Sequence, residues 1–179
     1  MRATHYKIAA TALLLATSTG IQAFSINLDY SLDANDFFGD SSSSRRVVMD
    51  AAASFFESRL TDDFTAITSA GTNSMTATFF NPATGDEGSK TNFSVAANTI
   101  TVFVGGRDLG GSTLGRGGYG GWSASGSDPF LETIRHRGES GLMYNTTDTS
   151  KDANEFNPWG GSISFDTDSS WYFDSDPST

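Results

Sequence analysis

The sequence predicts a mixed α/β domain of the layered α+β kind, with one long helix packed on a twisted mixed sheet of about five strands. Apolar and polar residues alternate over 24–30, which is the period of a half-buried strand. Apolar residues then recur at helical spacing over 43–60. Short segments rich in β-branched and aromatic residues follow between 64 and 104, so several strands come after the helix.

Residues 1–23 are expected to be a secretory signal peptide. Arg2 and Lys7 give a basic start, an apolar run covers 8–16, and Ala23 is the small residue that a signal peptidase needs. The segment is too short for a membrane span; a buried N-terminal helix is the alternative. Export would make the protein secreted or periplasmic and leave 24–179 as one domain.

The net charge and the lack of cysteine limit which partners and which chemistry are possible. The formal net charge is −10, and loss of Arg2 and Lys7 with the signal would make it −12. Such a charge repels phosphate backbones and anionic lipids, so we expect neither nucleic acid nor membrane insertion after signal cleavage. The chain has no cysteine, which excludes disulfides, thiolate metal sites and a cysteine nucleophile. Export without cysteine is more typical of a bacterial protein than of a small animal secreted domain.

The first strand is expected over 24–30, with Phe24, Ile26, Leu28 and Tyr30 on one face. The serines at 41–44 offer helix N-cap oxygens, and the helix is predicted over 43–60. Its apolar positions are Val48, Ala51, Ala52, Phe55, Phe56 and Leu60.

Further strands are predicted at 64–67 and 75–80, with turn residues at 81–85. The segment 93–104 is predicted to be a core strand, and Ile163 and Phe165 mark the last strand. Between them, 129–137 is predicted to be a short helix and 138–155 a polar loop.

The segment 105–121 holds nine glycines in seventeen residues, which excludes a stable helix. Gly115, Gly117 and Gly120 have the GxGxxG spacing, but no helix is expected after them, so we do not infer a dinucleotide site. A surface loop or irregular hairpin is predicted. It would border a substrate cleft, hold an ion through backbone carbonyls, or simply connect two elements.

The histidines do not support a zinc site. Only His5 and His136 are present, and His136 lies between Arg135 and Arg137, whose charges disfavour a bound cation. No GxSxG motif is present for serine catalysis, and no carboxylate pair stands out as a glycosidase pair.

Closely spaced carboxylates near the end of the sequence are the better metal candidates. Asp166 and Asp168 form one DxD pair, and Asp174 and Asp176 form a second on the other side of Trp171. Oxygen ligands at such spacing suit calcium, although they do not follow the EF-hand register. We therefore take Asp166 and Asp168 as calcium candidates; a solvated acidic turn is the alternative.

The same region resembles a known enzyme family. Two glycines at 160–161, Phe165-Asp166 and Trp171 match in register the strand and turn that precede the zinc helix of matrixins, which belong to the metzincin clan of metalloproteases. The resemblance implies a calcium ligand at Asp166. It places Ser164 where the family has a structural-zinc histidine, and Ser169 where it has a second calcium carboxylate.

Most of the predicted mature chain is also similar to a group of exported bacterial metalloproteases. The similarity rests on the opening strand 24–30, the Ser-Arg-Arg start of the helix at 44–46, and the segment 103–111. It implies that 24–179 is a metzincin-like N-terminal subdomain, incomplete at its C-terminus.

The resemblance implies an exported zinc metalloendopeptidase whose edge strand pairs with an extended peptide substrate. The zinc-binding motif HExxHxxGxxH is absent from the 179 residues, so this chain is expected to be inactive, with the zinc helix encoded further on. Zinc is expected in the complete enzyme, and no residue of this chain is predicted to bind it. The alternative is a noncatalytic exported binding module at the cell surface that depends on calcium.

Overall fold

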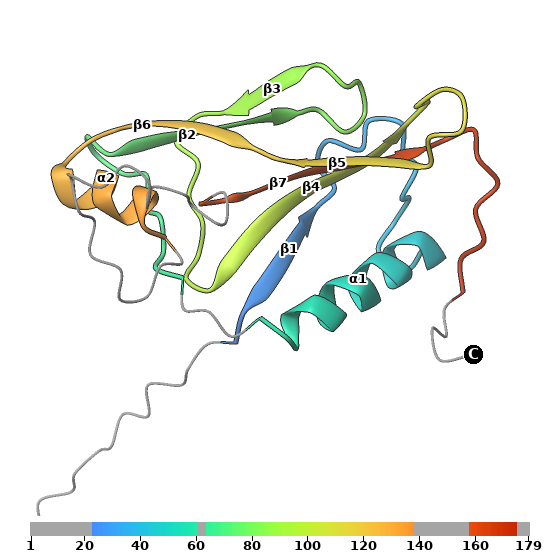
Figure 1. Cartoon of the computed structure of the whole chain (residues 1–179), viewed down its shortest axis with the longest axis horizontal. Helices are drawn as coiled ribbons and strands as arrows, with labels where there is room; N and C mark the ends of the chain where they lie inside the picture. The colour runs from blue at the N-terminus through green and yellow to red at the C-terminus, as the bar shows by residue number, and fades with distance from the viewer. Residues whose placement is uncertain (1–22, 61–63, 138–157, 175–179) are drawn as a thin grey trace, which may run out of the picture.

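The computed structural model describes residues 23–60, 64–137 and 158–174. The described residues form seven strands and two helices, and this confirms the mixed α/β class (Figure 1). One detail of the prediction is corrected: the strands divide between two sheets instead of forming one sheet of about five.

The first sheet has four strands in the order β1-β4-β7-β5. Strands β1 (Ser25–Asp29), β4 (Thr99–Arg107) and β7 (Gly160–Asp166) are parallel to one another. Strand β5 (Gly115–Tyr119) pairs antiparallel with β7 and forms one edge. Parallel strands are normally covered on both faces, so what lies on each face of this sheet is informative.

The second sheet is antiparallel, in the order β3-β2-β6. Its strands are β3 (Glu87–Lys90), β2 (Ser74–Phe80) and β6 (Gly121–Ser125). Only Gly120 separates β5 from β6, so one stretch of chain runs from the first sheet into the second (Figure 1). A Cβ atom on Gly120 would lie 1.8 Å from Trp159 Cζ2, which explains the glycine at this crossing.

The main hydrophobic core lies between the two sheets. Phe103 of β4 and Met75 of β2 are fully buried there, and Trp159, just before β7, is buried with them. The rings of Phe79 and Phe103 have centroids 4.4 Å apart, and the Trp159 ring is 5.6 Å from that of Phe103. One face of the first sheet is therefore covered by the second sheet.

Helix α1 (Ser44–Glu57) lies on the opposite face of the first sheet, beside β1 (Figure 1). Ser43 caps it, because its Oγ accepts a hydrogen bond from the Arg46 N–H at 3.3 Å. At the other end, Glu57 Oε1 accepts from the Ile26 N–H of β1 at 2.6 Å. The prediction of 43–60 located this helix, which ends three residues earlier than expected.

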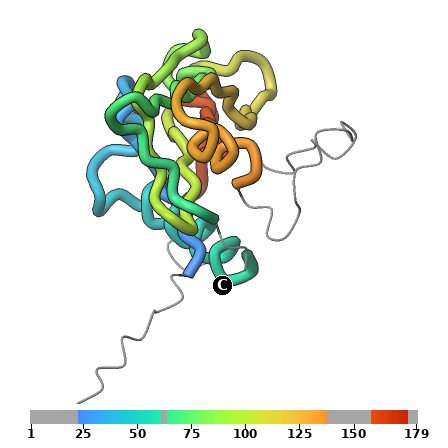
Figure 2. The backbone as a smooth tube through the Cα atoms, turned by 90° about the vertical axis from the view of Figure 1, so that its left-hand side faces the viewer, coloured from blue at the N-terminus to red at the C-terminus, as the bar shows by residue number. Residues whose placement is uncertain are grey.

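Helix α2 (Asp128–Arg135) confirms the helix predicted at 129–137. It follows the end of β6 and lies beside the start of β2 in Figure 1, and it is the orange coil in Figure 2. Phe130 and Ile134 are one turn apart and are buried in the main core. No helix in the described ranges is long and apolar enough to span a membrane.

Several predicted boundaries are corrected. The segment predicted as a strand at 93–104 is a strand only from Thr99, because Asn98 has a φ of 51° and interrupts the extended backbone. The strand predicted at 64–67 is reduced to one bridge between Ile67 and Val95. Strand β3 was not predicted, since its sequence is polar and shows no apolar alternation.

The prediction of a loop or hairpin over 105–121 was wrong. Three strands share this segment, and only 108–114 and Gly120 lie outside a strand. Glycine fits within β4 because Phe37 packs on it: a Cβ atom on Gly106 would lie 2.4 Å from the Phe37 side chain. The predicted signal peptide, apart from Ala23, and the whole of the polar loop predicted at 138–155 lie outside the described residues.

Candidate functional site

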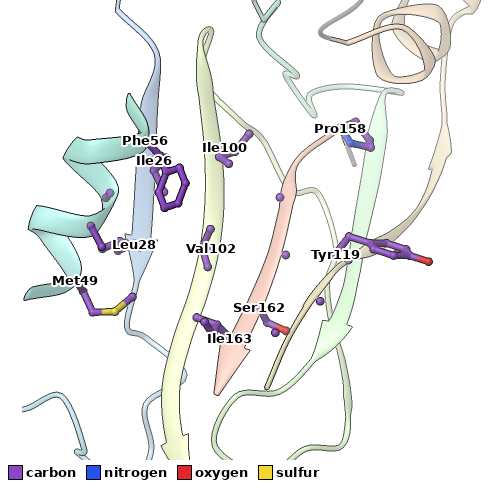
Figure 3. A pocket seen from close by; sticks show the side chains of 18 of the residues that line it. Ile26, Leu28, Met49, Phe56, Ile100, Val102, Tyr119, Pro158, Ser162 and Ile163 are labelled. Atoms are coloured by element: carbon purple, nitrogen blue, oxygen red, sulfur yellow. The ribbon is translucent and has the colours of Figure 1, made fainter. Parts of the chain in front are cut away.

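The face of the first sheet that carries α1 is hollowed into an apolar groove with a volume of about 960 Å³ (Figure 3). The strand register aligns its floor in rows: Leu28, Val102 and Gly161 lie side by side, and Ile163 lies beside Gly117. Paired residues of neighbouring strands point to the same side, so the apolar side chains of three strands face this groove together.

Helix α1 forms one wall of the groove. Met49, Ala52, Ala53 and Phe56 line it, at the i, i+3, i+4, i+7 spacing of a single helix face. Phe56 nevertheless remains 55% exposed, although its ring centroid lies 5.5 Å from that of Phe55. The helix covers the β1 edge and leaves the floor over β4 and β7 open.

The opposite wall is formed by β5 and the start of β6, and it is mostly bare backbone. Gly117, Gly118, Gly120 and Gly121 line it, together with the side chains of Tyr119 and Trp122. The Tyr119 side chain points away from the sheet and is 88% exposed (Figure 3). Of the described residues that line the groove, none carries a charged side chain. Apolar contact is therefore the main interaction that this surface offers.

The structure separates the two calcium candidates. Asp166 is buried at the end of β7, whereas Asp168 is exposed two residues later. Asp166 Oδ1 accepts from the Leu109 N–H at 2.8 Å, and its Oδ2 accepts from the Ser169 hydroxyl at 2.6 Å. These hydrogen bonds, first that from Leu109 and then that from Ser169, hold the pKa of the Asp166 carboxyl below its ordinary value.

Ser169 therefore has a clear role at the position where the resemblance expects a second carboxylate. A carboxylate pair would need a cation between its like charges, but the serine hydroxyl donates directly to Asp166. Ser164, at the position of the family's histidine, is buried, and Arg107 Nε approaches its Oγ at 3.4 Å.

No zinc site is formed by the described residues. His136 Nε2 lies 3.4 Å from Glu132 Oε1, four residues earlier. Within 23–60, 64–137 and 158–174, no group of three or more His, Cys, Asp or Glu residues is arranged to hold a metal. The residues present thus do not fit a catalytic zinc ion, and no step of a zinc mechanism can be assigned to them. Calcium at Asp166 and Asp168 stays a prediction.

Comparisons of the chain with protein-family models, curated proteins and solved structures gave no match.

Sequence reasoning missed the groove and the edge strand beside it. Ile100, Val102 and Val104 alternate with Thr101 and Phe103, and this pattern did predict a core strand with Ile100, Val102 and Val104 on one face. It did not show that this face lacks a full cover. The extent of this cover depends on how far α1 reaches across the sheet, and no local sequence pattern predicts that.

Proposed function

We propose that this chain is the N-terminal sheet-and-helix part of an exported zinc metalloendopeptidase of the metzincin type, catalytically inactive by itself. The observation that carries the proposal is the open apolar groove beside α1. A largely parallel sheet that the described residues cover only in part on one face is an incomplete layer arrangement.

The groove has room for one more helix. Neighbouring strands lie about 4.8 Å apart, so the span from β1 to β5 is about 14 Å. Packed helices lie about 8–10 Å apart, so α1 above β1 leaves space for a second helix above β7. In the family that residues 160–171 resemble, the next element is the zinc-binding helix. A helix with an apolar stripe would cover Val102 and Ile163.

The order of elements also supports the proposal. A strand, a helix and further strands come before residues 160–171, and the resemblance implies the same order. The edge strand β5 would form the upper wall of a cleft and pair with an extended peptide substrate. Secretion or periplasmic export rests on the signal-like residues 1–23, and calcium on Asp166 and Asp168.

The decisive experiment is to sequence the genomic DNA for a few hundred bases beyond codon 179. We expect an HExxHxxGxxH motif within a few dozen codons, in frame or after a frame shift. A stop codon without this motif in any of the three frames would contradict the protease assignment.

The groove also favours a second candidate, a noncatalytic exported binding module. Its volume of about 960 Å³ is in the range of ligand sites, and its lining is apolar. A module of this kind should unfold cooperatively as 24–179 and bind an apolar ligand without further sequence. An incomplete protease subdomain should instead expose the groove and aggregate.

A further inference from the structure

The second sheet has an outer face that points away from the main core. Met75, Ala77 and Phe79 of β2 are buried in that core, so the alternate residues of the strand point outward. In β6, Trp122 and Ala124 pack against the same core, and their neighbours point outward too. In the described part of the chain no helix packs on this outer side, and α1 lies across the first sheet from it (Figure 1).

This outer face carries six hydroxyl side chains from three adjacent strands. They belong to Ser74, Thr76, Thr78, Ser89, Ser123 and Ser125, which we call the hydroxyl face. The register sets Thr76 opposite Ser123 and Thr78 opposite Ser89, and paired residues point to the same side. On the other side of Thr78, a Cβ atom on Gly121 would lie 2.6 Å from Thr78 Oγ1, so the glycine leaves room for this hydroxyl.

The six hydroxyls are available to a ligand. Within the described ranges, no other protein group forms a hydrogen bond with any of them. A hydroxyl group donates one hydrogen bond and accepts two, so each can match either a donor or an acceptor.

An exposed aromatic ring continues the row of hydroxyls along β2. Phe80 follows Thr78 on the same side of the strand and is 64% exposed. The face of an aromatic ring is slightly negative and attracts the C–H groups of a ligand. Glu87, which is paired with Phe80, is the only charged residue that the described register places on this face.

The size and charge of this surface limit what it can bind. The seven residues of β2 span about 24 Å, and three strands are about 14 Å wide, which gives roughly 300 Å². A stable protein interface needs about 800 Å² from each partner, so the face is too small to hold a second copy of the chain. It offers no cation to a phosphate, sulfate or carboxylate group. A narrow, uncharged polymer rich in hydroxyl groups matches both limits.

We propose that the hydroxyl face and Phe80 bind a neutral polysaccharide that lies along β2. Sugar hydroxyls exchange hydrogen bonds with side chains such as Thr76 and Thr78, and one sugar ring stacks its C–H face on Phe80. The proposal goes beyond the proposed function and does not rest on it, because none of these residues lines the groove.

Polysaccharide binding by the full 179-residue chain tests this directly. The probes are insoluble cellulose and chitin, by cosedimentation, and soluble dextran and galactomannan, by affinity gel electrophoresis. Polygalacturonate, which is anionic, is the control for charge. We expect at least one neutral polysaccharide to bind and polygalacturonate not to bind.

Two variants test the two kinds of contact separately. Phe80→Ala removes the ring, and we expect the dissociation constant to rise about tenfold. Phe55→Ala is its matched control, because Phe55 is 53% exposed on α1 and should leave binding unchanged. The double variant Thr76→Val/Thr78→Val removes two hydroxyls while keeping β-branched side chains, and it should also weaken binding about tenfold. If one variant fails to fold, the other still decides the question.

The proposal is overturned if none of the four neutral polysaccharides binds, or if polygalacturonate binds as tightly as they do. It is also overturned if Phe55→Ala weakens binding as much as Phe80→Ala does. A dimer in light scattering that Phe80→Ala dissociates would assign the face to a second copy and overturn it as well. These results do not depend on the sequence beyond codon 179. A missing HExxHxxGxxH motif would contradict the protease and leave the polysaccharide site standing.

Discussion

Arg137 joins segments that are far apart in the sequence through their backbone carbonyls. Its guanidinium donates to the carbonyl oxygens of Thr65, Ala96 and Thr99 at 2.7 Å, and to that of Pro158 at 2.5 Å. The residue is only 5% exposed, and burial lowers the pKa of its side chain to about 10, so it stays charged at neutral pH. The five donors of a guanidinium suit such a cluster of acceptors better than an ammonium does.

Replacing Arg137 should therefore destabilise the whole domain. Arg137→Met leaves four carbonyl oxygens, at one buried and three partly buried bonds, without this donor, and we expect the free energy of unfolding to fall by about 3 kcal/mol or more. Urea denaturation measures this change. Arg135→Met, at an exposed position of α2, is the matched control and should stay within about 0.5 kcal/mol of wild type. Equal losses in the two variants would exclude this role for Arg137.

The carboxyl group of Asp166 should make the free energy of unfolding depend on pH in the acidic range. Its pKa is lower in the folded chain than in the unfolded chain, so its contribution is complete above the unfolded value of about 4 and is lost as the pH falls through the lower, folded value. Asp166→Asn removes the charge but keeps the shape. We expect a modest fall in melting temperature at neutral pH and a shallower fall with acid than in wild type. Parallel pH profiles of the two proteins would contradict the assignment.

Calcium is tested with the same pair of proteins. If Asp166 and Asp168 bind calcium, millimolar calcium should raise the melting temperature of wild type and not that of Asp166→Asn. Magnesium is the control, because it prefers stricter octahedral geometry. An equal effect of both ions on both proteins would leave Asp166 with only its structural hydrogen bonds to Leu109 and Ser169.

At the residue scale, the sequence identified Asp166 as a residue of interest, but it did not reveal the hydrogen bonds that this side chain makes. Asp166 was selected because of its DxD spacing, and the structure shows instead the bonds to Leu109 and Ser169. Arg137 was considered only as a neighbour of His136. Its acceptors on Thr65 and Thr99 belong to residues 72 and 38 positions away in the chain, and no local pattern can reveal such a set.

At the element scale, glycines in neighbouring strands have opposite roles. A Cβ atom on Gly161 of β7 would lie 2.2 Å from the Gly118 carbonyl oxygen of β5, whereas one on Gly118 would meet nothing within 4 Å. Gly161 thus lets the two strands approach, and Gly118 does not contribute to that contact. We expect Gly161→Ala to lower the free energy of unfolding by about 1–3 kcal/mol.

Gly118→Ala is the control for that variant, and it should be neutral or stabilise by about 0.5 kcal/mol, because alanine loses less backbone entropy on folding. Thermal and urea unfolding of both variants measure these changes in the free energy of unfolding. A larger loss in Gly118→Ala than in Gly161→Ala would mean that β5 does not pair with β7 in the register that sets Gly118 opposite Ser162.

Elements with a complete periodic pattern were predicted well. The strands at 25–29 and 74–80 and the two helices each show their period within a single segment. The errors in the strand boundaries have local causes that hydrophobic periodicity cannot show. Asn98 adopts a left-handed conformation and shortens β4, and the glycines of 105–121 obscure strands whose side chains would otherwise alternate.

At the scale of the whole molecule, the first sheet is covered unequally. The second sheet packs on one face, with Phe103 and Trp159 inaccessible to solvent, while α1 covers only part of the other. The strands that share 105–121 pass from the first sheet to the second at Gly120, so the two sheets are covalently joined beside the groove. The sequence predicted the helix layer on one sheet, but it did not predict the second sheet that covers the other face.

An exposed apolar groove should bind a fluorescent apolar probe in the native state. We expect the full chain to enhance the fluorescence of 8-anilinonaphthalene-1-sulfonate without denaturant, because Phe56 and the sheet floor are open to solvent. Phe56→Ser should reduce this enhancement. Phe55→Ser is the matched control, since Phe55 is 53% exposed on the same helix and does not line the groove. Equal reductions would mean that the probe binds elsewhere. Loss of probe binding, together with a rise in melting temperature, in a longer chain that includes the downstream helix would identify that helix as the cover of the groove.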